Sequence, residues 1–439
     1  MKYTPKYIRK TLKKTISEIS LNPQAFSKNP EKDFSRTRKL PFEKVVNSVL
    51  SMSCKDLKCE LMDIFEFDEN LPTVSAFVQQ RNKISSNAFE TIFKNFTSSF
   101  TKQKLYKGWR LLAVDGSDLH TPTNKNEIAS FYPGSNGQKP YNLMHLNALY
   151  DIMNNLYVDA IVQPSHNSNE HKAFVSMVDR DISTLPTIYI ADRGYESYNN
   201  LAHIQEKGQF FLIRIKDTTA NGISSSLTLP KSAEFDVSVV LNLTRKQTNQ
   251  TKKDKNLKFV PHNCNFDYLP AHCKKAIPVK PYSLSLRLVR IEISENKYEL
   301  LITNLKPEDF SPADLKQLYS MRWGIETSFR ELKYTVGLLH FHAKKVEHIY
   351  QEVFARLIMY NFTELITSHV VIQKFNRKHP CKANFSVAVQ VCRQFLLGNI
   401  SPPDVEATIS RNVSVTRTGR SNPRNMVVKH AISFLYRVA

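Results

Sequence analysis

A regular succession of strand-like and helix-like segments between residues 109 and 216 most constrains the fold of this chain. Three apolar segments of strand length come first, WRLLAVD, LMHLNALYD and LYVDAIVQ, and the short turn 153–155 joins the last two as in a hairpin. A helix near 170–178, the strand TIYIAD, a helix near 197–207 and the strand FFLIRIK follow. This order predicts an α/β fold built on a mixed sheet.

Two of these strand-like segments end in an aspartate. Asp115 ends LLAVD and Asp192 ends TIYIAD, so both carboxylates would stand at the carboxyl edge of the sheet, where open α/β sheets place their sites. Each aspartate alone is more often a turn residue, because Gly follows the first and Arg-Gly follows the second. Their shared position favours a functional pair, and we assign the nearby Asp118 a supporting place.

The segment Ser311–Val336, SPADLKQLYSMRWGIETSFRELKYTV, is predicted to form one helix. Its start carries a capping serine, a proline at the first helical position and the acid of a capping box, which are Ser311, Pro312 and Asp314. Gly337 follows the segment and suits the end of a helix.

Four polar residues of this helix, Tyr319, Arg322, Glu326 and Lys333, share a stripe about 60° wide when each residue turns by about 100°. An apolar stripe beside them would face the core. For an isolated helix the simpler interpretation is a pattern of surface ion pairs, since Glu326 lies four positions from Arg322 and from Arg330. With the two strand-end aspartates, however, Glu326 gives three carboxylates, and carboxylate oxygens are what two divalent metal ions need.

These four residues, spaced Tyr-x2-Arg-x3-Glu-x6-Lys, resemble the signature of bacterial insertion-sequence transposases of the IS-four type. The segments Asp115-Gly-Ser and Asp192-Arg-Gly-Tyr resemble the other two acidic motifs of that family, in the same order. The resemblance covers about residues 109–345. It implies a ribonuclease H-like catalytic core whose first and fourth strands are central neighbours, with the two aspartates side by side.

The resemblance also implies an activity. It is that of a DDE-type DNA transposase, which cleaves at the ends of its element and transfers the freed strands into target DNA by cut-and-paste, through DNA hairpins. Asp115, Asp192 and Glu326 would be the catalytic acids and the ligands of two Mg²⁺ ions, for which Mn²⁺ can substitute. Asp115 would bridge the ions, and the other two acids would each bind one.

Six residues are assigned to DNA contacts on the same basis: Tyr319, Arg322, Lys333, Arg330, Trp323 and Tyr298. The first three would hold phosphates beside the cleaved end. Trp323 lies about 60° off the polar stripe, so it is either a wedge into DNA or, more commonly for such a residue, a packing residue. Tyr298 belongs to a β-rich insertion, where its ring could stack on an unpaired base, although core packing is the commoner use.

We divide the chain into five regions: a helical N-terminal DNA-binding region (1–105), the first part of the catalytic core (106–216), a β-rich insertion that departs from the compact sheet (217–304), the helix with the third acid (305–345) and a helical C-terminal region with a basic tail (346–439). The N-terminal helices fit a helix-turn-helix-like reader and a plain helical bundle equally well. In the first case Gln79, Gln80, Arg81 and Lys83 would touch DNA. The apolar segment 348–372 is interpreted as core support behind the catalytic helix.

The net charge of +21 favours a polyanionic partner, which we take to be double-stranded DNA at the terminal inverted repeats and at the target. The basic residues are spread along the chain, no apolar run reaches about 18 residues, and the basic start lacks the apolar centre of a signal peptide. We therefore expect a cytoplasmic bacterial protein, nucleoid-associated when bound to DNA, with no membrane partner and no small-molecule cofactor. Because two element ends must be brought together, a homodimer on DNA is expected.

Two alternatives remain open at this point. No common zinc-site spacing fits the four residues His262, Cys264, His272 and Cys273, so an ordinary polar loop is the preferred interpretation. The six scattered cysteines are interpreted as reduced thiols.

The alternative function is a catalytically inactive, transposase-derived DNA-binding protein. The intact set of three acids favours the enzyme, because an acidic site without metal repels phosphate and brings no benefit to a protein that only binds DNA.

Overall fold

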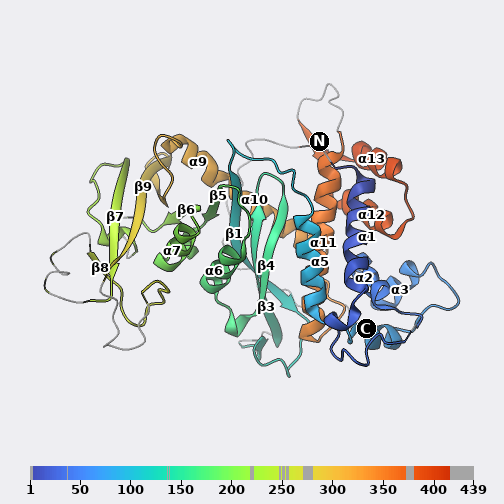
Figure 1. The fold of residues 1–439 in the computed structure, drawn as a ribbon. Helices are drawn as coiled ribbons and strands as arrows, with labels where there is room; N and C mark the ends of the chain where they lie inside the picture. The colour runs from blue at the N-terminus through green and yellow to red at the C-terminus, as the bar shows by residue number, and fades with distance from the viewer. Residues whose placement is uncertain are drawn as a thin grey trace.

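The computed structural model describes residues 3–415 except 37, 136, 138, 218–221, 247–248, 250–252, 254–256, 270–279 and 372–379. The described chain forms one large mixed sheet, with helices against its faces and a helical body beside one end of it (Figure 1). The strands of this sheet are β1 (Arg110–Thr121), β2 (Phe131–Tyr132), β3 (Tyr141–Asp151), β4 (Leu156–Pro164), β5 (Thr187–Ala191), β6 (Phe210–Ile215), β7 (Phe235–Thr244), β8 (Leu257–Phe259), β9 (Tyr282–Ser294) and β10 (Lys297–Thr303).

The first and fourth strands of the predicted core are neighbours. Strand β1 pairs with β5 in parallel and with β3 in antiparallel, β4 pairs with β3, and β6 runs parallel to β5. The resulting order β4-β3-β1-β5-β6 is the ribonuclease H-like order. The predicted fold class is therefore confirmed.

The central strands are apolar because both of their faces are covered. Leu112 and Val114 of β1 pack into a core with α6 (Glu170–Arg180) and α7 (Tyr198–Glu206). Leu111 and Ala113, on the opposite face, join the cores that contain the helices after Ser311. Strands buried on both faces read as continuous apolar runs, which is why LLAV and TIYIA were recognisable in the sequence.

The insertion continues the core sheet instead of departing from it. Strand β10 pairs antiparallel with β6, through Leu300 opposite Ile215, and β9, β7 and β8 follow outward in that order. The expectation that the chain leaves the compact sheet after about residue 217 was therefore wrong. The physical reason is that β6 would otherwise be an edge strand with unpaired backbone groups, and β10 supplies the partners. Much of the charged run 244–258 lies outside the described residues.

The predicted single helix Ser311–Val336 is divided into three parts. They are α9 (Pro312–Met321), α10 (Trp323–Arg330) and a π-helical turn (Glu331–Thr335). The capping box at Ser311 is present as predicted. The break falls at Arg322, whose N–H bonds to the carbonyl of Tyr319 three residues back, and the weak helix former Gly324 lies just beyond it.

The first and last helices of the described chain together form the helical body beside the sheet (Figure 1). Its helices are α1 (Pro5–Ser20), α2 (Phe42–Ser51), α3 (Leu57–Ile64), α4 (Val74–Arg81), α5 (Ser86–Ser98), α11 (Val346–His369), α12 (Phe385–Leu397) and α13 (Pro402–Arg411). The short strands β11 (Cys381–Ala383) and β12 (Val413–Val415) pair with each other. The 3-10 turns are Pro23–Phe26, Ser165–Asn167, Arg193–Tyr195 and Ser224–Ser226.

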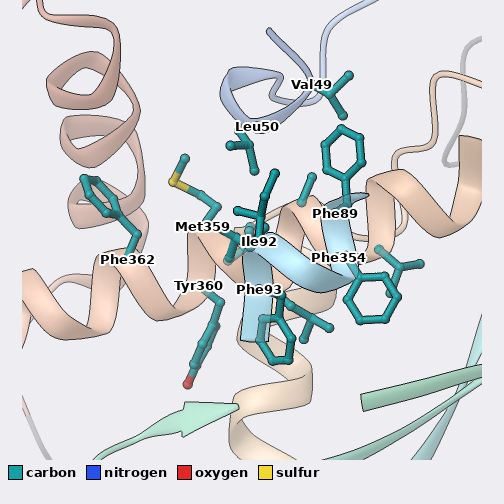
Figure 2. Packing of buried hydrophobic residues seen from close by; sticks show 14 of the residues in the cluster. Val49, Leu50, Phe89, Ile92, Phe93, Phe354, Met359, Tyr360 and Phe362 are labelled. Carbon is teal, nitrogen blue, oxygen red and sulfur yellow. The ribbon is translucent and has the colours of Figure 1, made fainter. Parts of the chain in front are cut away.

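Helix α11 is the centre of this body. Figure 2 shows Phe354 and Met359 of α11 among Phe89, Ile92 and Phe93 of α5, with residues of α2 beside them. Its predicted place as core support is confirmed by the burial of most of its side chains. In the part of the chain that the structure describes, no helix is long and apolar enough to cross a membrane.

Arg81 supports the bundle interpretation of the N-terminal helices. Its side chain is buried, and its guanidinium donates to Gln351 Oε1 and Glu352 Oε1, each over 2.8 Å, and to the His348 carbonyl. The expectation that Arg81 could touch DNA was therefore wrong for this residue. A guanidinium that is removed from water needs such partners, and α11 supplies them all.

Candidate active site

One cavity of about 600 Å³ collects almost every residue that the sequence singled out. Its lining residues include the predicted acids Asp115, Asp192 and Glu326 together with Tyr319, Arg322, Trp323, Arg330 and Lys333. Of the six residues assigned to DNA contacts from the resemblance, Tyr298 is the one that does not line it. The cavity lies between the carboxyl edge of the core strands and the helices α9 and α10.

Asp115 stands in the middle of β1, not at its end. The strand continues to Thr121, because its pairing with β3 runs on through Asp115 opposite Ala148 and beyond. The parallel pairing with β5, in contrast, ends at Ala113 and Ile190. The two strands therefore stop pairing just before Asp115, whose side chain lines the cavity.

Asp115 carries an unusually basic carboxylate. Burial raises its pKa to about 6, and the nearby charges of Asp192 and Glu326 act in the same direction. The Gly116 N–H, 2.9 Å from Asp115 Oδ1, and the Arg322 guanidinium oppose this increase. The charges of Asp192 and Glu326 are therefore close enough to repel that of Asp115, as expected for carboxylates that share a site.

Asp192 follows β5 directly and also shapes the turn after it. Its Oδ1 accepts the N–H of Gly194 over 2.8 Å and caps the 3-10 turn Arg193–Tyr195. Asp192 is therefore a turn residue and a cavity residue at the same time. The bond fixes one carboxylate oxygen, because an Asx-type turn needs only one.

Glu326 is held by the arginine one turn before it. Arg322 Nη2 donates to Glu326 Oε1 over 2.9 Å, so the i,i+4 ion pair considered from the sequence is present. The Arg322 side chain is 5% exposed and lies 5.7 Å from the ring centres of both Tyr319 and Trp323. Trp323 itself is 52% exposed, so it is not a core packing residue.

Lys333 comes from the π-helical turn and reaches back to β1. Its Nζ donates to the backbone carbonyl of Asp118 over 2.7 Å. Burial lowers the pKa of Lys333, while Asp118 and Asp115 oppose that change. Single π-helical turns are rare and occur often at functional sites, and here the turn brings the ammonium to the cavity.

A charged triplet supports β1 from the side. His145 Nδ1 lies 2.7 Å from Asp118 Oδ1 and His145 Nε2 lies 2.9 Å from Glu170 Oε1. Although burial alone would lower the pKa of His145, these two carboxylates raise it to about 9. A Cβ on Gly116 would lie only 2.5 Å from His145 Nε2, so the Asp-Gly motif needs glycine for space. The supporting place predicted for Asp118 agrees with this arrangement.

Two residues differ from the sequence-based expectation: Arg214, which was not predicted to line the cavity, and Tyr298, which was predicted to contact DNA. Arg214 of β6 lines the cavity and pairs with Glu299 of β10 over 3.0 Å. It could have been noticed in the sequence as a charged residue within the apolar strand FFLIRIK. Tyr298 is next to Glu299, so its side chain points to the other face of the strand, where Arg290 lies 4.4 Å from its ring centre.

The donor set suits a hard divalent cation. Three carboxylates line one cavity, and Mg²⁺ prefers a few carboxylates together with water and phosphate oxygens. Among the described residues, no three His, Cys, Asp or Glu side chains already form a group that could enclose a metal ion. Of the four residues considered for zinc, His272 and Cys273 lie outside the described residues.

Comparison with known families identifies the family to which the chain belongs. Residues 107–362, more than half of the chain, match the family described as the transposase DDE domain. The chain belongs to this family of DDE transposases, and the resemblance noted in the sequence is confirmed at this level.

Individual relatives are distant. The transposase InsG for insertion sequence element IS4 of Escherichia coli (strain K12) is 22% identical over 339 residues, and the match covers 74% of this chain and 70% of that protein. The transposase for insertion sequence element IS231B of Bacillus thuringiensis subsp. berliner is 23% identical over 292 residues, 62% of this chain and 59% of that protein. A cryo-EM structure of the piggyBac transposase synaptic complex with hairpin DNA has 9% identity and a TM-score of 0.46, and the alignment covers 96% of this chain and 87% of that one.

Proposed function

We propose that this protein is an active DNA transposase that cleaves DNA at the ends of its element and joins those ends to target DNA. The observation that supports this most directly is the common cavity of Asp115, Asp192 and Glu326, lined also by Arg322 and Lys333. Phosphodiester cleavage and strand transfer need no covalent protein intermediate, and an acidic metal site beside phosphate-binding cations is sufficient.

Asp115, Asp192 and Glu326 would hold the metal ions, with Asp115 as the shared ligand. Two bound Mg²⁺ ions, or Mn²⁺ in their place, would supply Lewis acidity at the attacking and leaving oxygens. The carboxylates themselves would set the positions of these charges. The Gly194 N–H and the Gly116 N–H each hold one oxygen of their aspartate and so limit its rotation.

The cations of the cavity would bind the DNA backbone. Arg322 can present its planar guanidinium to two phosphate oxygens, while Lys333 and Arg330 supply positive charge nearby. The exposed ring of Trp323 would contact a base or sugar at the same place. Tyr298 lies on the other strand face, so a stacking role for it requires DNA to reach that face as well.

The finer points of the reaction are part of the same proposal. The partner is double-stranded DNA, at inverted repeats and at the target, because the chain carries a net charge of +21. A hairpin route and a homodimer on DNA are proposed because one protein must cut both strands at two ends. We place the reaction in the cytoplasm, on nucleoid DNA.

The alternative is a transposase-derived protein that binds DNA without cutting it. Incubation of the full-length protein with labelled duplex carrying the flanking element end, with and without Mg²⁺, separates the two. The test variant is Glu326→Gln, which keeps the hydrogen bond to Arg322 and removes the charge. The control is Glu308→Gln, the same change at an exposed loop position.

Metal-dependent cleavage at the element boundary by the wild-type and Glu308→Gln proteins, lost in Glu326→Gln while DNA binding persists, would support the enzyme. A hairpin product would support the hairpin route. Binding without cleavage by the wild-type protein, in Mg²⁺ and in Mn²⁺, would contradict the proposal and favour the alternative.

A further inference from the structure

A second cavity, of about 290 Å³, lies in the N-terminal helical region and away from the three acids. It is formed by the segment before α2 and the end of α4, and its lining residues are Glu31, Lys32, Phe34, Ser35, Arg36, Arg38, Leu40, Gln80 and Lys83. We propose that this cavity, called here the basic pocket, binds backbone phosphates of the DNA on which the active site acts. The inference rests on the proposed function, since it concerns the same DNA.

The charges of the basic pocket are strongly unbalanced. Four cations, Lys32, Arg36, Arg38 and Lys83, face one acid, Glu31. Within the described residues, the side chains of Lys32, Arg36 and Arg38 form no hydrogen bond or ion pair, and all three are exposed. Cations gathered without acidic partners repel one another, and a polyanion relieves that repulsion.

The buried Arg81 in the same region shows the contrast. Arg81, only two residues from Lys83, is fully enclosed and bonds to a carboxylate, an amide and a carbonyl. The positive charge of Arg81 thus has a structural use, the attachment of α4 to α11. Nothing in the described packing accounts in this way for Arg36 and Arg38, which makes a ligand the better explanation for them.

The pocket walls are fixed by the surrounding chain. The buried Asp33 carboxylate accepts the backbone N–H of Asn29 over 3.0 Å, and the Lys28 N–H bonds to the Lys83 carbonyl over 2.8 Å. The ring of Phe34 packs edge-on against Phe42. These contacts hold the wall around Asp33 and Phe34 in place, which lowers the conformational entropy that phosphate binding would cost there.

A short series of contacts connects β1 with the basic pocket. Asn124, three residues after β1 ends, donates to the carbonyl of Lys344 over 3.3 Å. The next residue, Lys345, donates to Asn82 Oδ1 over 3.4 Å, and Asn82 precedes Lys83 of the pocket. Both lysines are exposed, and the acid Glu347 follows them in the chain. Under the proposal, a duplex bound at the three acids would reach the pocket past these residues.

Guanidinium groups suit the phosphodiester in particular. Their planar donors match two oxygens of one phosphate, and Ser35 and Gln80 add neutral hydrogen-bonding groups at the same place. Such contacts carry no sequence information, so they would add affinity and fix the orientation of the duplex without reading bases. The basic pocket would thus position DNA for the active site.

The test measures equilibrium binding of the full-length protein to fluorescein-labelled duplex by anisotropy, over a series of KCl concentrations. The variant Arg36→Ala/Arg38→Ala is compared with Lys6→Ala/Lys10→Ala, which removes the same charge from exposed positions of α1. Each lost phosphate contact lowers the slope of log K against log [salt] by about 0.9. We expect the pocket variant to bind about ten-fold more weakly near 0.1 M salt, with a slope smaller by about 2.

Three further observations separate the possible outcomes. Arg36→Lys/Arg38→Lys should keep most of the slope, and an unchanged far-ultraviolet circular dichroism melt for all variants shows that the fold is intact. Equal binding and equal slopes for the pocket and control variants would overturn the proposal. The proposal would also be overturned if inorganic phosphate, added at constant ionic strength, abolished the difference in DNA affinity between the pocket and control variants. The pocket would then be a site for small anions. If the wild-type protein neither binds nor cleaves the duplex, the proposed function fails first, whatever the pocket variant does.

Discussion

Gly116→Ala tests how the structure holds the first acid. A Cβ at this position would lie 2.5 Å from His145 Nε2 and 2.6 Å from Glu170 Oε1, far inside ordinary contact. The φ of Gly116 is not in the left-handed region, so the substitution brings no backbone strain. Any effect must come from the lack of space between β1 and these two side chains.

The size of the effect follows from what has to move. The imidazole of His145 is held between Asp118, at 2.7 Å, and Glu170, at 2.9 Å, and it cannot retreat from the new methyl group without losing part of this arrangement. Both carboxylates are substantially exposed, so each pair contributes only about 0–1 kcal/mol. Overpacking of a fitted site costs about 1–3 kcal/mol. We expect a loss of about 1–3 kcal/mol in the free energy of unfolding.

The effect on catalysis should be larger than the effect on stability suggests. Asp115 precedes Gly116, so a shift of β1 moves its carboxylate away from Asp192 and Glu326. A misplacement of about 1 Å can lower a rate on the order of a hundred-fold. The assays are urea unfolding followed by tryptophan fluorescence and single-turnover cleavage of the element-end duplex.

The chain offers a matched control and a rescue. At Gly324 of α10, in the helix that carries the third acid, an added Cβ would make ordinary contacts of 3.7 and 3.8 Å with Tyr150 and Ile152. Gly324→Ala should leave stability unchanged or raise it by up to about 1 kcal/mol. Gly116→Ala/His145→Ala should recover part of the lost rate. If Gly116→Ala behaves like Gly324→Ala in both assays, the steric argument is refuted.

Three other predictions follow from buried or paired charges. Arg81→Met should lower the unfolding free energy by about 3–5 kcal/mol in urea titrations, because it leaves the Glu352 carboxylate buried with one partner fewer; a loss below about 1 kcal/mol would contradict this. Burial opposes ionisation of Glu60, yet its hydrogen bonds with His342, Ser53 and Lys55 lower its pKa to about 2. Since the folded pKa lies below the unfolded value, this stabilisation is present above about pH 4.5 and is lost as the pH falls towards 2, so Glu60→Gln should flatten the acid limb of a stability–pH curve. Asp118→Asn should lower the pKa of His145 from about 9, measured by NMR titration of the ring, and an unchanged pKa would show that Asp118 does not hold the charge.

The sequence could predict the parts of this fold that depend on local pattern. Buried strands form uninterrupted apolar runs, and the resemblance to insertion-sequence transposases implied the neighbours β1 and β5, which the sheet confirms. It could not predict that β10 joins the sheet at β6, because strand pairing across about 85 residues leaves no mark on either segment. The length of β1 beyond Asp115 was missed for a related reason, since it depends on the register of β3.

Residues of the candidate site that belong to a sequence motif could be predicted. Residues whose place depends on which face of a strand or helix they occupy could not. Asp115, Asp192 and Glu326 meet in one cavity as expected. Tyr298 was selected for its aromatic ring, but side chains alternate between the two faces of a strand, and the neighbouring Glu299 is the one that lines the cavity. Arg81 was selected for its charge, but only the tertiary structure reveals the buried carboxylate of Glu352 beside it.

The C-terminal region fixes the end of the helix that carries the third acid, which no local pattern could indicate. Arg393 of α12 is 3% exposed, and its Nη2 donates to the carbonyl of Val336 over 2.7 Å, directly after the π-helical turn. On the other side, Lys333 of the same turn bonds to the Asp118 carbonyl on β1. A π-helical turn is less stable than an α-helical one, so these two bonds from separate elements explain why it persists here. Because this turn places Lys333 at the cavity of the three acids, α12 supports the candidate site as well as the core, and removing α12 would release one of the two bonds.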